Sequence, residues 1–149
     1  NSALKNRVAA AEITIEQRQR EPEDDLVIKE LVLPGPDVPV IDESRLLAEF
    51  GGDREILAEL RDLFLSQAPP LHDAILGALD NGDISVLVKD AHSLKGACAT
   101  YGAPRLTMVC KEIELAGKAN DLETARAWRS VFELEYAALS EGINRIAQN

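Results

Sequence analysis

Hydrophobic positions between residues 84 and 101 recur at alternating intervals of three and four. The stripe consists of Ile84, Leu87, Ala91, Leu94, Cys98 and Tyr101. This spacing places its members on one face of an α-helix, and a helical bundle buries such a face. Gly102 follows as a helix stop, and Pro104 stands where proline favours the first turn of a helix. The pattern therefore predicts one helix over 84–101 and a second that runs to about Gly117.

The segment before this helix carries further boundary signals. Residues 42–44 and Phe50 delimit a predicted short helix, which Gly51-Gly52 ends before Asp53 caps the next one. That next helix is expected to turn five apolar side chains inward: Ile56, Leu57, Leu60, Leu63 and Phe64. Pro69-Pro70 falls inside the pattern. Because proline removes a backbone N–H, we expect a kink or break there.

The boundaries between the later helices also have clear sequence signals. Asn81-Gly82 predicts a turn, and Asp83 and Asp121 are predicted to cap the helices that follow them. The last helix is expected to be continuous, with an apolar stripe of Ala125, Trp128, Phe132, Tyr136, Leu139, Ile143 and Ile146. Long helices with short joints pack as antiparallel neighbours. We therefore predict an all-α fold, an antiparallel up-down four-helix bundle with a short extra N-terminal helix.

Residues 1–40 are predicted to form an irregular or helical N-terminal arm. Residues 2–20 have helical apolar spacing, but the segment is too short for a coiled coil to be stable alone. Three prolines within residues 34–39 predict a stiff linker, because proline fixes φ. We therefore divide the chain into an arm, 1–40, and a helical domain, 41–149.

Composition excludes several classes of function. Hydrophobic residues make up 46% of the chain but aromatic residues only 4%, which favours a helical core. A net charge of -10 argues against nucleic-acid binding, because phosphates would be repelled. No apolar run reaches the roughly 18 residues of a membrane span and no secretory signal is recognisable, so we expect a cytoplasmic location without membrane contact. Cys98 and Cys110 form no C-x-x-C pair and the histidines lack ligand spacing, which predicts buried thiols and no metal site.

Basic residues gather in one window of this acidic chain. Residues 89–118 carry a net charge of +2, which leaves -12 for the remainder. The basic residues of the window are Lys89, Lys95, Arg105, Lys111 and Lys118. Such a window suggests an anion or an acidic partner at this place, and ordinary scatter of surface charge is the alternative.

His92 follows the stripe position Ala91 by one residue, which is about 100° around the helix. Its ring is therefore expected at the edge of the buried face, within reach of solvent. Four positions share its face at spacings of three, four and seven: Lys89, Lys95, Gly96 and Ala99. The predicted surface shows an imidazole between two ammonium groups, beside two positions with almost no side chain.

This arrangement suits phosphoryl chemistry. A neutral imidazole is a nucleophile, and the lysines would favour that neutral form and offset the charge of a phosphoryl group. Gly96 and Ala99 would leave room for another protein to approach the ring. The alternative is a surface histidine beside a packing glycine. His72 has neither flanking lysines nor a glycine, and we interpret it as a structural or surface residue.

The run Ala91-His92-Ser93-Leu94-Lys95-Gly96-Ala97 resembles the signature of histidine phosphotransfer (HPt) domains. The similarity continues through Tyr101-Gly102-Ala103, Leu106, Cys110 and Ile113-Glu114, and it covers about residues 40–147. The resemblance implies that His92 accepts a phosphoryl group from an aspartyl phosphate on a response-regulator receiver domain and passes it to another receiver. The chain would then be a carrier without catalysis of its own.

The resemblance also implies roles for the neighbours of His92. Lys95 would hold the phosphoryl group, with Lys89 beside it, and Gly96 would give access to it. Glu114, on the neighbouring helix, would orient the ring. The divalent metal and the catalytic aspartate would belong to the receiver, so no cofactor is expected here.

Other readings stay open at this point. The chain could be the phosphoacceptor domain of a chemotaxis-type histidine kinase, or a module that only binds receivers; it could also belong to a hybrid sensor kinase in one polypeptide. The common nucleotide-binding, metalloprotease and hydrolase motifs are absent, which argues against an autonomous enzyme.

Overall fold

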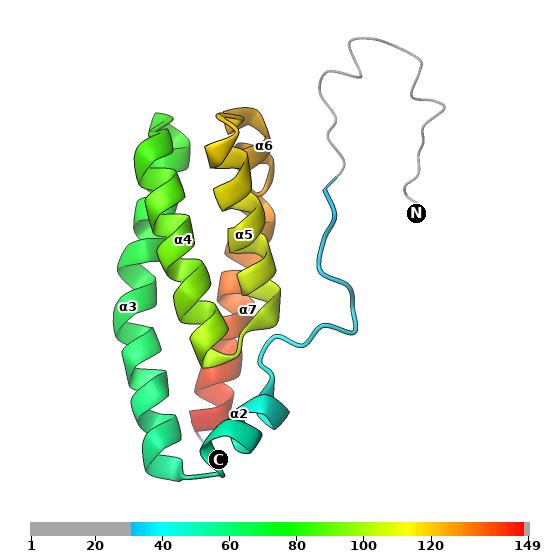
Figure 1. The fold of residues 1–149 in the computed structure, drawn as a ribbon, viewed down its shortest axis with the longest axis vertical. Helices are drawn as coiled ribbons and strands as arrows, with labels where there is room; N and C mark the ends of the chain where they lie inside the picture. The colour runs from blue at the N-terminus through cyan, green and yellow to red at the C-terminus, as the bar shows by residue number, and fades with distance from the viewer. Residues whose placement is uncertain (1–30, 148–149) are drawn as a thin grey trace. The chain divides into compact units, whose positions relative to one another are not determined.

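The computed structural model describes residues 31–147, and every regular element in that range is an α-helix. The helices, labelled as in Figure 1, are α2 (Glu43–Phe50), α3 (Arg54–Asn81), α4 (Ile84–Tyr101), α5 (Pro104–Lys118), α6 (Leu122–Ala127) and α7 (Arg129–Ala147). α3, α4 and α5 alternate in direction, and α6 with α7 forms the fourth member of the bundle (Figure 1). The predicted all-α fold with a short extra helix is confirmed. Predictions for residues 1–30 lie outside the described residues, and the boundary between arm and domain stays a prediction.

The helix ends follow the predicted chemistry. A side-chain carboxylate accepts a backbone N–H of the first turn at four helix starts: Asp42, Asp53, Asp83 and Asp121. Gly82 and Gly102 end α3 and α4 with φ of 72° and 92°, a left-handed conformation in which a side chain would be strained. These ends fix where α4, the helix that carries His92, begins and stops.

α3 runs without interruption through Pro69-Pro70, so the predicted break is wrong. Both prolines are exposed, which lets water reach the carbonyl groups that lose their helical N–H partners. Ala68 and Ile75, on the two sides of the prolines, are fully buried. Burial of the helix face on both sides of the pair therefore outweighs the hydrogen bonds that the prolines remove.

The fourth member of the bundle consists of two helices, α6 and α7, whereas the sequence predicted one continuous helix. The N–H of Trp128 bonds to the carbonyl of Ala125, three residues back, at 3.1 Å. This tighter turn separates α6 from α7. Trp128 itself is buried, so the apolar stripe continues across the break. No proline or glycine marks the position in the sequence, which is why the pattern did not predict it.

Two of the five side chains expected inside α3 lie at the surface. Phe64 is buried together with Ala68 and Ile75, which defines the buried direction of the helix. Ile56 and Leu63 point about 100° away from that direction, and 39% and 50% of their surface is exposed. The prediction was wrong because the apolar stripe is wider than the face that the neighbouring helices cover.

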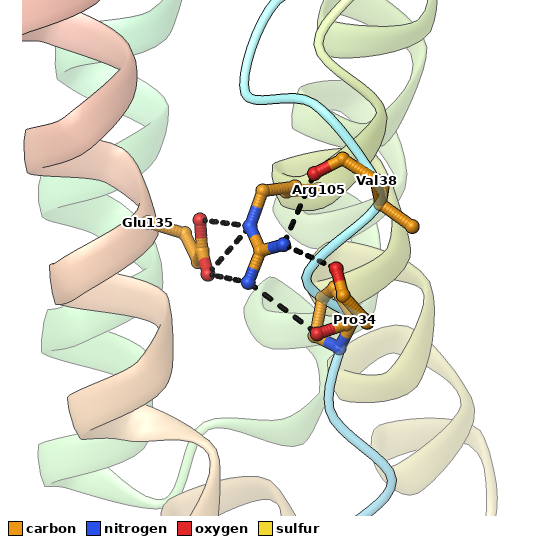
Figure 2. Close-up of polar contacts among 5 residues, drawn as sticks. Pro34, Val38, Arg105 and Glu135 are labelled. Carbon is orange, nitrogen blue, oxygen red and sulfur yellow. Dashed lines mark hydrogen bonds and ion pairs between the residues drawn. The ribbon is translucent and has the colours of Figure 1, made fainter.

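One basic residue of the window, Arg105, holds the segment before α2 against the bundle (Figure 2). Its guanidinium donates to the Glu135 carboxylate of α7 at 2.9–3.0 Å, to the carbonyl of Gly35 at 2.6 Å and to that of Val38 at 3.1 Å. The hydrogen bond to Glu135 raises the pKa of Arg105. Arg105 is nine residues, or two and a half turns, from Glu114 on α5, so the two side chains leave opposite sides of the helix.

Candidate functional site

His92 projects from α4 with 66% of its side chain exposed, as the edge-of-stripe position predicted. Its Nδ1 lies 2.8 Å from Oε2 of Glu114 on α5. An ionised carboxylate only accepts hydrogen bonds, so we assign the proton to Nδ1. The second ring nitrogen, Nε2, then keeps a free lone pair. The ring is thus held by one nitrogen and is nucleophilic at the other.

Glu114 is buried beneath the ring, with 3% of its side chain exposed. Lys95 Nζ lies 2.7 Å from Oε1, and Lys118 Nζ lies 3.0 Å from Oε2. The Lys95 contact is an ion pair rather than an aligned hydrogen bond, because no donor reaches Oε1 in hydrogen-bond geometry. Burial raises the pKa of Glu114, but contacts with Lys95, Lys118 and His92 outweigh burial and lower it to about 2. The carboxylate is therefore ionised at neutral pH.

The two other predicted neighbours of His92 lie outside this cluster. Lys89 is 76% exposed, and its Nζ lies 3.8 Å from Asp90 rather than at Glu114. Ala99 is exposed on α4. The structure thus brings His92, Lys95 and Glu114 together, and it leaves Lys89 and Ala99 on the surface nearby.

Gly96 lies in the middle of α4, one turn after His92, and is exposed. A Cβ atom built at this position would meet no other atom within 4 Å. Glycine in a helix interior is less stable than alanine by about 1 kcal/mol. Packing inside the domain therefore gives no reason for a glycine here.

An open groove of about 740 Å³ runs beside His92 between α3 and α4. Its lining includes Leu60, Leu63, Gln67 and Pro70 from α3, and Ser93, Gly96 and Thr100 from α4. The half-exposed Leu63, which was expected in the core, is thus part of this surface. The groove places apolar area directly next to the nucleophilic ring.

The second histidine has a different environment. His72 stacks on Tyr136 with ring centroids 4.1 Å apart, and its Nδ1 lies 3.0 Å from Asp73. This geometry agrees with a structural residue. Cys98 and Cys110 are free and buried, as predicted. Within residues 31–147, no group of three or more His, Cys, Asp or Glu side chains could hold a metal ion.

Sequence analysis did not identify two parts of the site. Lys118 stands four residues after Glu114, a spacing that predicts an ion pair along one helix, so this signal was present. The contribution of α3 to the groove had no signal, because it depends on how α3 and α4 pack together.

An up-down helical bundle that exposes an oriented histidine on its second long helix has the architecture of phosphotransfer domains. The Hpt domain family model matches residues 59–146, more than half of the chain, and the chain belongs to this family. It is therefore a phosphorelay signalling domain, and domains of this family work with receiver domains in two-component systems.

Solved structures agree with this assignment. Histidine-containing phosphotransfer protein B from Pseudomonas aeruginosa PAO1 is 27% identical, with a TM-score of 0.68 over 75% of this chain and 97% of that one. A histidine-containing phosphotransfer protein from maize has the same fold at 23% identity, with a TM-score of 0.63 over 73% of this chain and 83% of that one. No curated protein sequence matches the chain significantly. Across the helices that the structure describes, none has the length and apolar character needed to cross a membrane.

Proposed function

We propose that His92 is the phosphoacceptor, which takes a phosphoryl group from an aspartyl phosphate on one receiver domain and passes it to an aspartate on another. The observation that carries this proposal is the bond from Nδ1 to Glu114, which leaves Nε2 free on an exposed ring. A nucleophile needs such a free electron pair, held in a fixed direction.

The transfer balances without any further reactant. The Nε2 lone pair forms the N–P bond, and the P–O bond breaks with its electrons leaving on the donor carboxylate. The imidazole retains its Nδ1 proton and becomes positively charged, and the ionised Glu114 stabilises that charge at 2.8 Å. In the second transfer the same proton makes the ring a better leaving group, because the imidazole departs neutral.

The neighbours of His92 contribute charge and access. Lys95, one turn further along α4, would stabilise the phosphoryl oxygens, and the exposed Lys89 would add positive charge at the rim. Gly96 and Ala99 would leave space for the receiver to approach the ring. The groove between α3 and α4 would receive apolar side chains of that partner.

The chain acts in this proposal as a carrier, because His92 both accepts the phosphoryl group and gives it up. The cytoplasm is the compartment where such a domain would meet receivers. A sensor kinase on the same polypeptide would supply the phosphoryl group through its own receiver.

Label transfer from receiver domains tests the proposal. The wild-type chain and its His92→Gln and His72→Gln variants are mixed with receivers that carry labelled phosphate. We expect acid-labile, base-stable label on the wild type and on His72→Gln, and none on His92→Gln. His72→Gln is the matched control, because it removes the other histidine of the chain. Unchanged labelling of His92→Gln, or failure of the wild type with every receiver of the source organism, would contradict the proposal.

A further inference from the structure

Glu114 has more positive charge around it than it needs for neutralisation. Lys95 contacts Oε1 at 2.7 Å, while Lys118 and His92 share Oε2 at 3.0 Å and 2.8 Å. With a neutral imidazole, one carboxylate and two ammonium groups leave the cluster at +1. A buried carboxylate requires one cation, because an unpaired buried charge is strongly destabilising. The second cation is therefore in surplus until an anion arrives.

The two lysines differ in what they can reach. Lys95 shares α4 with His92, one turn away, and its side chain is 29% exposed. Lys118 shares α5 with Glu114, is 57% exposed and ends its helix. A phosphoryl group on Nε2 would draw Lys95 outward, and Oε1, which has no hydrogen bond, would then lose its ion pair.

We propose that Lys118 is a positioning residue that keeps Glu114 paired when Lys95 turns to the phosphoryl group on His92. This inference rests on the proposed function of His92. Because Lys118 remains on Oε2, Glu114 stays ionised and continues to hold the Nδ1 proton throughout the transfer. Without Lys118, Lys95 would have to pair with both the phosphoryl group and the Glu114 carboxylate.

The remaining basic residues of the window cannot keep Glu114 paired in this way. Lys89 lies beside Asp90, and Arg105 leaves the opposite side of α5 to bind Glu135. Lys111 also belongs to α5, but within the described part of the chain it forms no ion pair with Glu114. Lys111 is exposed, as Lys118 is, and provides a matched control for removal of one charge from the same helix.

A simpler role for Lys118 must be separated from this one. A lysine in the last turn of a helix is stabilising wherever it points, because it interacts with the helix dipole. Such a role would change the unfolding temperature but would not depend on Glu114. The experiment therefore has to ask whether Lys118 acts through that carboxylate.

The first measurement is the titration of the Glu114 carboxyl by NMR, which needs no partner protein. Lys118→Met is expected to raise the pKa of Glu114 above its value of about 2, whereas Lys111→Met leaves it unchanged. The second is single-turnover phosphoryl transfer from a labelled receiver domain. Lys118→Met should slow transfer about three- to tenfold with little change in receiver binding, and Lys118→Arg should restore most of the rate.

A double-mutant cycle completes the test. In the Glu114→Gln background, Lys118→Met should have no further effect on the transfer rate, because the group through which it acts is gone. An equal loss in both backgrounds, or an unchanged Glu114 titration in Lys118→Met, would overturn the inference. A wild-type chain that accepts no phosphoryl group would instead refute the proposed function, while the titration would still report on Lys118.

Discussion

Gly96→Ala is expected to have opposite effects on the stability of the domain and on the rate of phosphoryl transfer. The new methyl group meets no atom within 4 Å, so the substitution adds no clash inside the domain. It removes the cost of a glycine in a helix interior, which is about 0.8 kcal/mol at an exposed position. For a unit of this size, that gain corresponds to a rise in Tm of about 3 °C. The variant should therefore be more stable than the wild type.

The rate of phosphoryl transfer should fall, whereas the stability rises. If a receiver packs over Gly96 to reach His92, the methyl group enters a close-packed interface, where overpacking costs about 1–3 kcal/mol. We expect kcat/KM for transfer from a phosphorylated receiver to fall at least about fivefold. Stopped-flow or quenched label transfer at several receiver concentrations measures this loss. Thermal unfolding of the same samples measures the gain in stability.

Gly77→Ala is the matched control for this experiment. Gly77 lies inside α3, a Cβ atom there would also meet nothing within 4 Å, and the residue does not line the groove beside His92. It should give the same gain in Tm with transfer unchanged. If Gly96→Ala transfers as fast as the wild type, the glycine does not serve partner access. If Gly96→Ala unfolds at a lower temperature, the helix needs the glycine for a reason internal to the domain.

Three further outcomes follow from the geometry. The pKa of Glu114 lies below its ordinary 4.5, so the stability that its ionised form contributes is present above pH 4.5 and is lost as pH falls toward about 2; urea unfolding of Glu114→Gln should show a flatter profile across that window. Arg105→Met should cost about 3 kcal/mol in denaturant unfolding because it leaves Glu135 buried without its partner, and adding Glu135→Met should recover part of the loss. Gly117→Ala places a Cβ atom 2.7 Å from Val88 Cγ2, so it should lower Tm and slow transfer together, whereas unchanged values of both would refute the contact.

Much of the fold could be predicted because its determinants are local. Capping aspartates, turn glycines and a stripe with helical spacing depend on residues close together in the chain, and the helix bounds around α4 follow from them. The exposure of His92 was predictable for the same reason, since its angle from Ala91 is set by the helix itself. The break at Trp128 was not, because no proline or glycine marks it, and the exposure of Leu63 was not, because it depends on what the neighbouring helices cover.

The contact between His92 and Glu114 depends on how α4 and α5 pack together. The sequence alone gives neither the separation of these helices nor their relative rotation. The structure shows one contact that lets these helices approach closely. Gly117 faces Val88 and Leu87 so closely that any side chain there would collide with Val88. This contact lies one turn from both His92 on α4 and Glu114 on α5, because Val88 precedes His92 by four residues and Gly117 follows Glu114 by three. The close approach at Gly117 is therefore adjacent to the 2.8 Å contact between the Glu114 carboxylate and the ring. A glycine that the sequence marks only as a helix end thus allows the close packing of α4 and α5 beside the contact between His92 and Glu114.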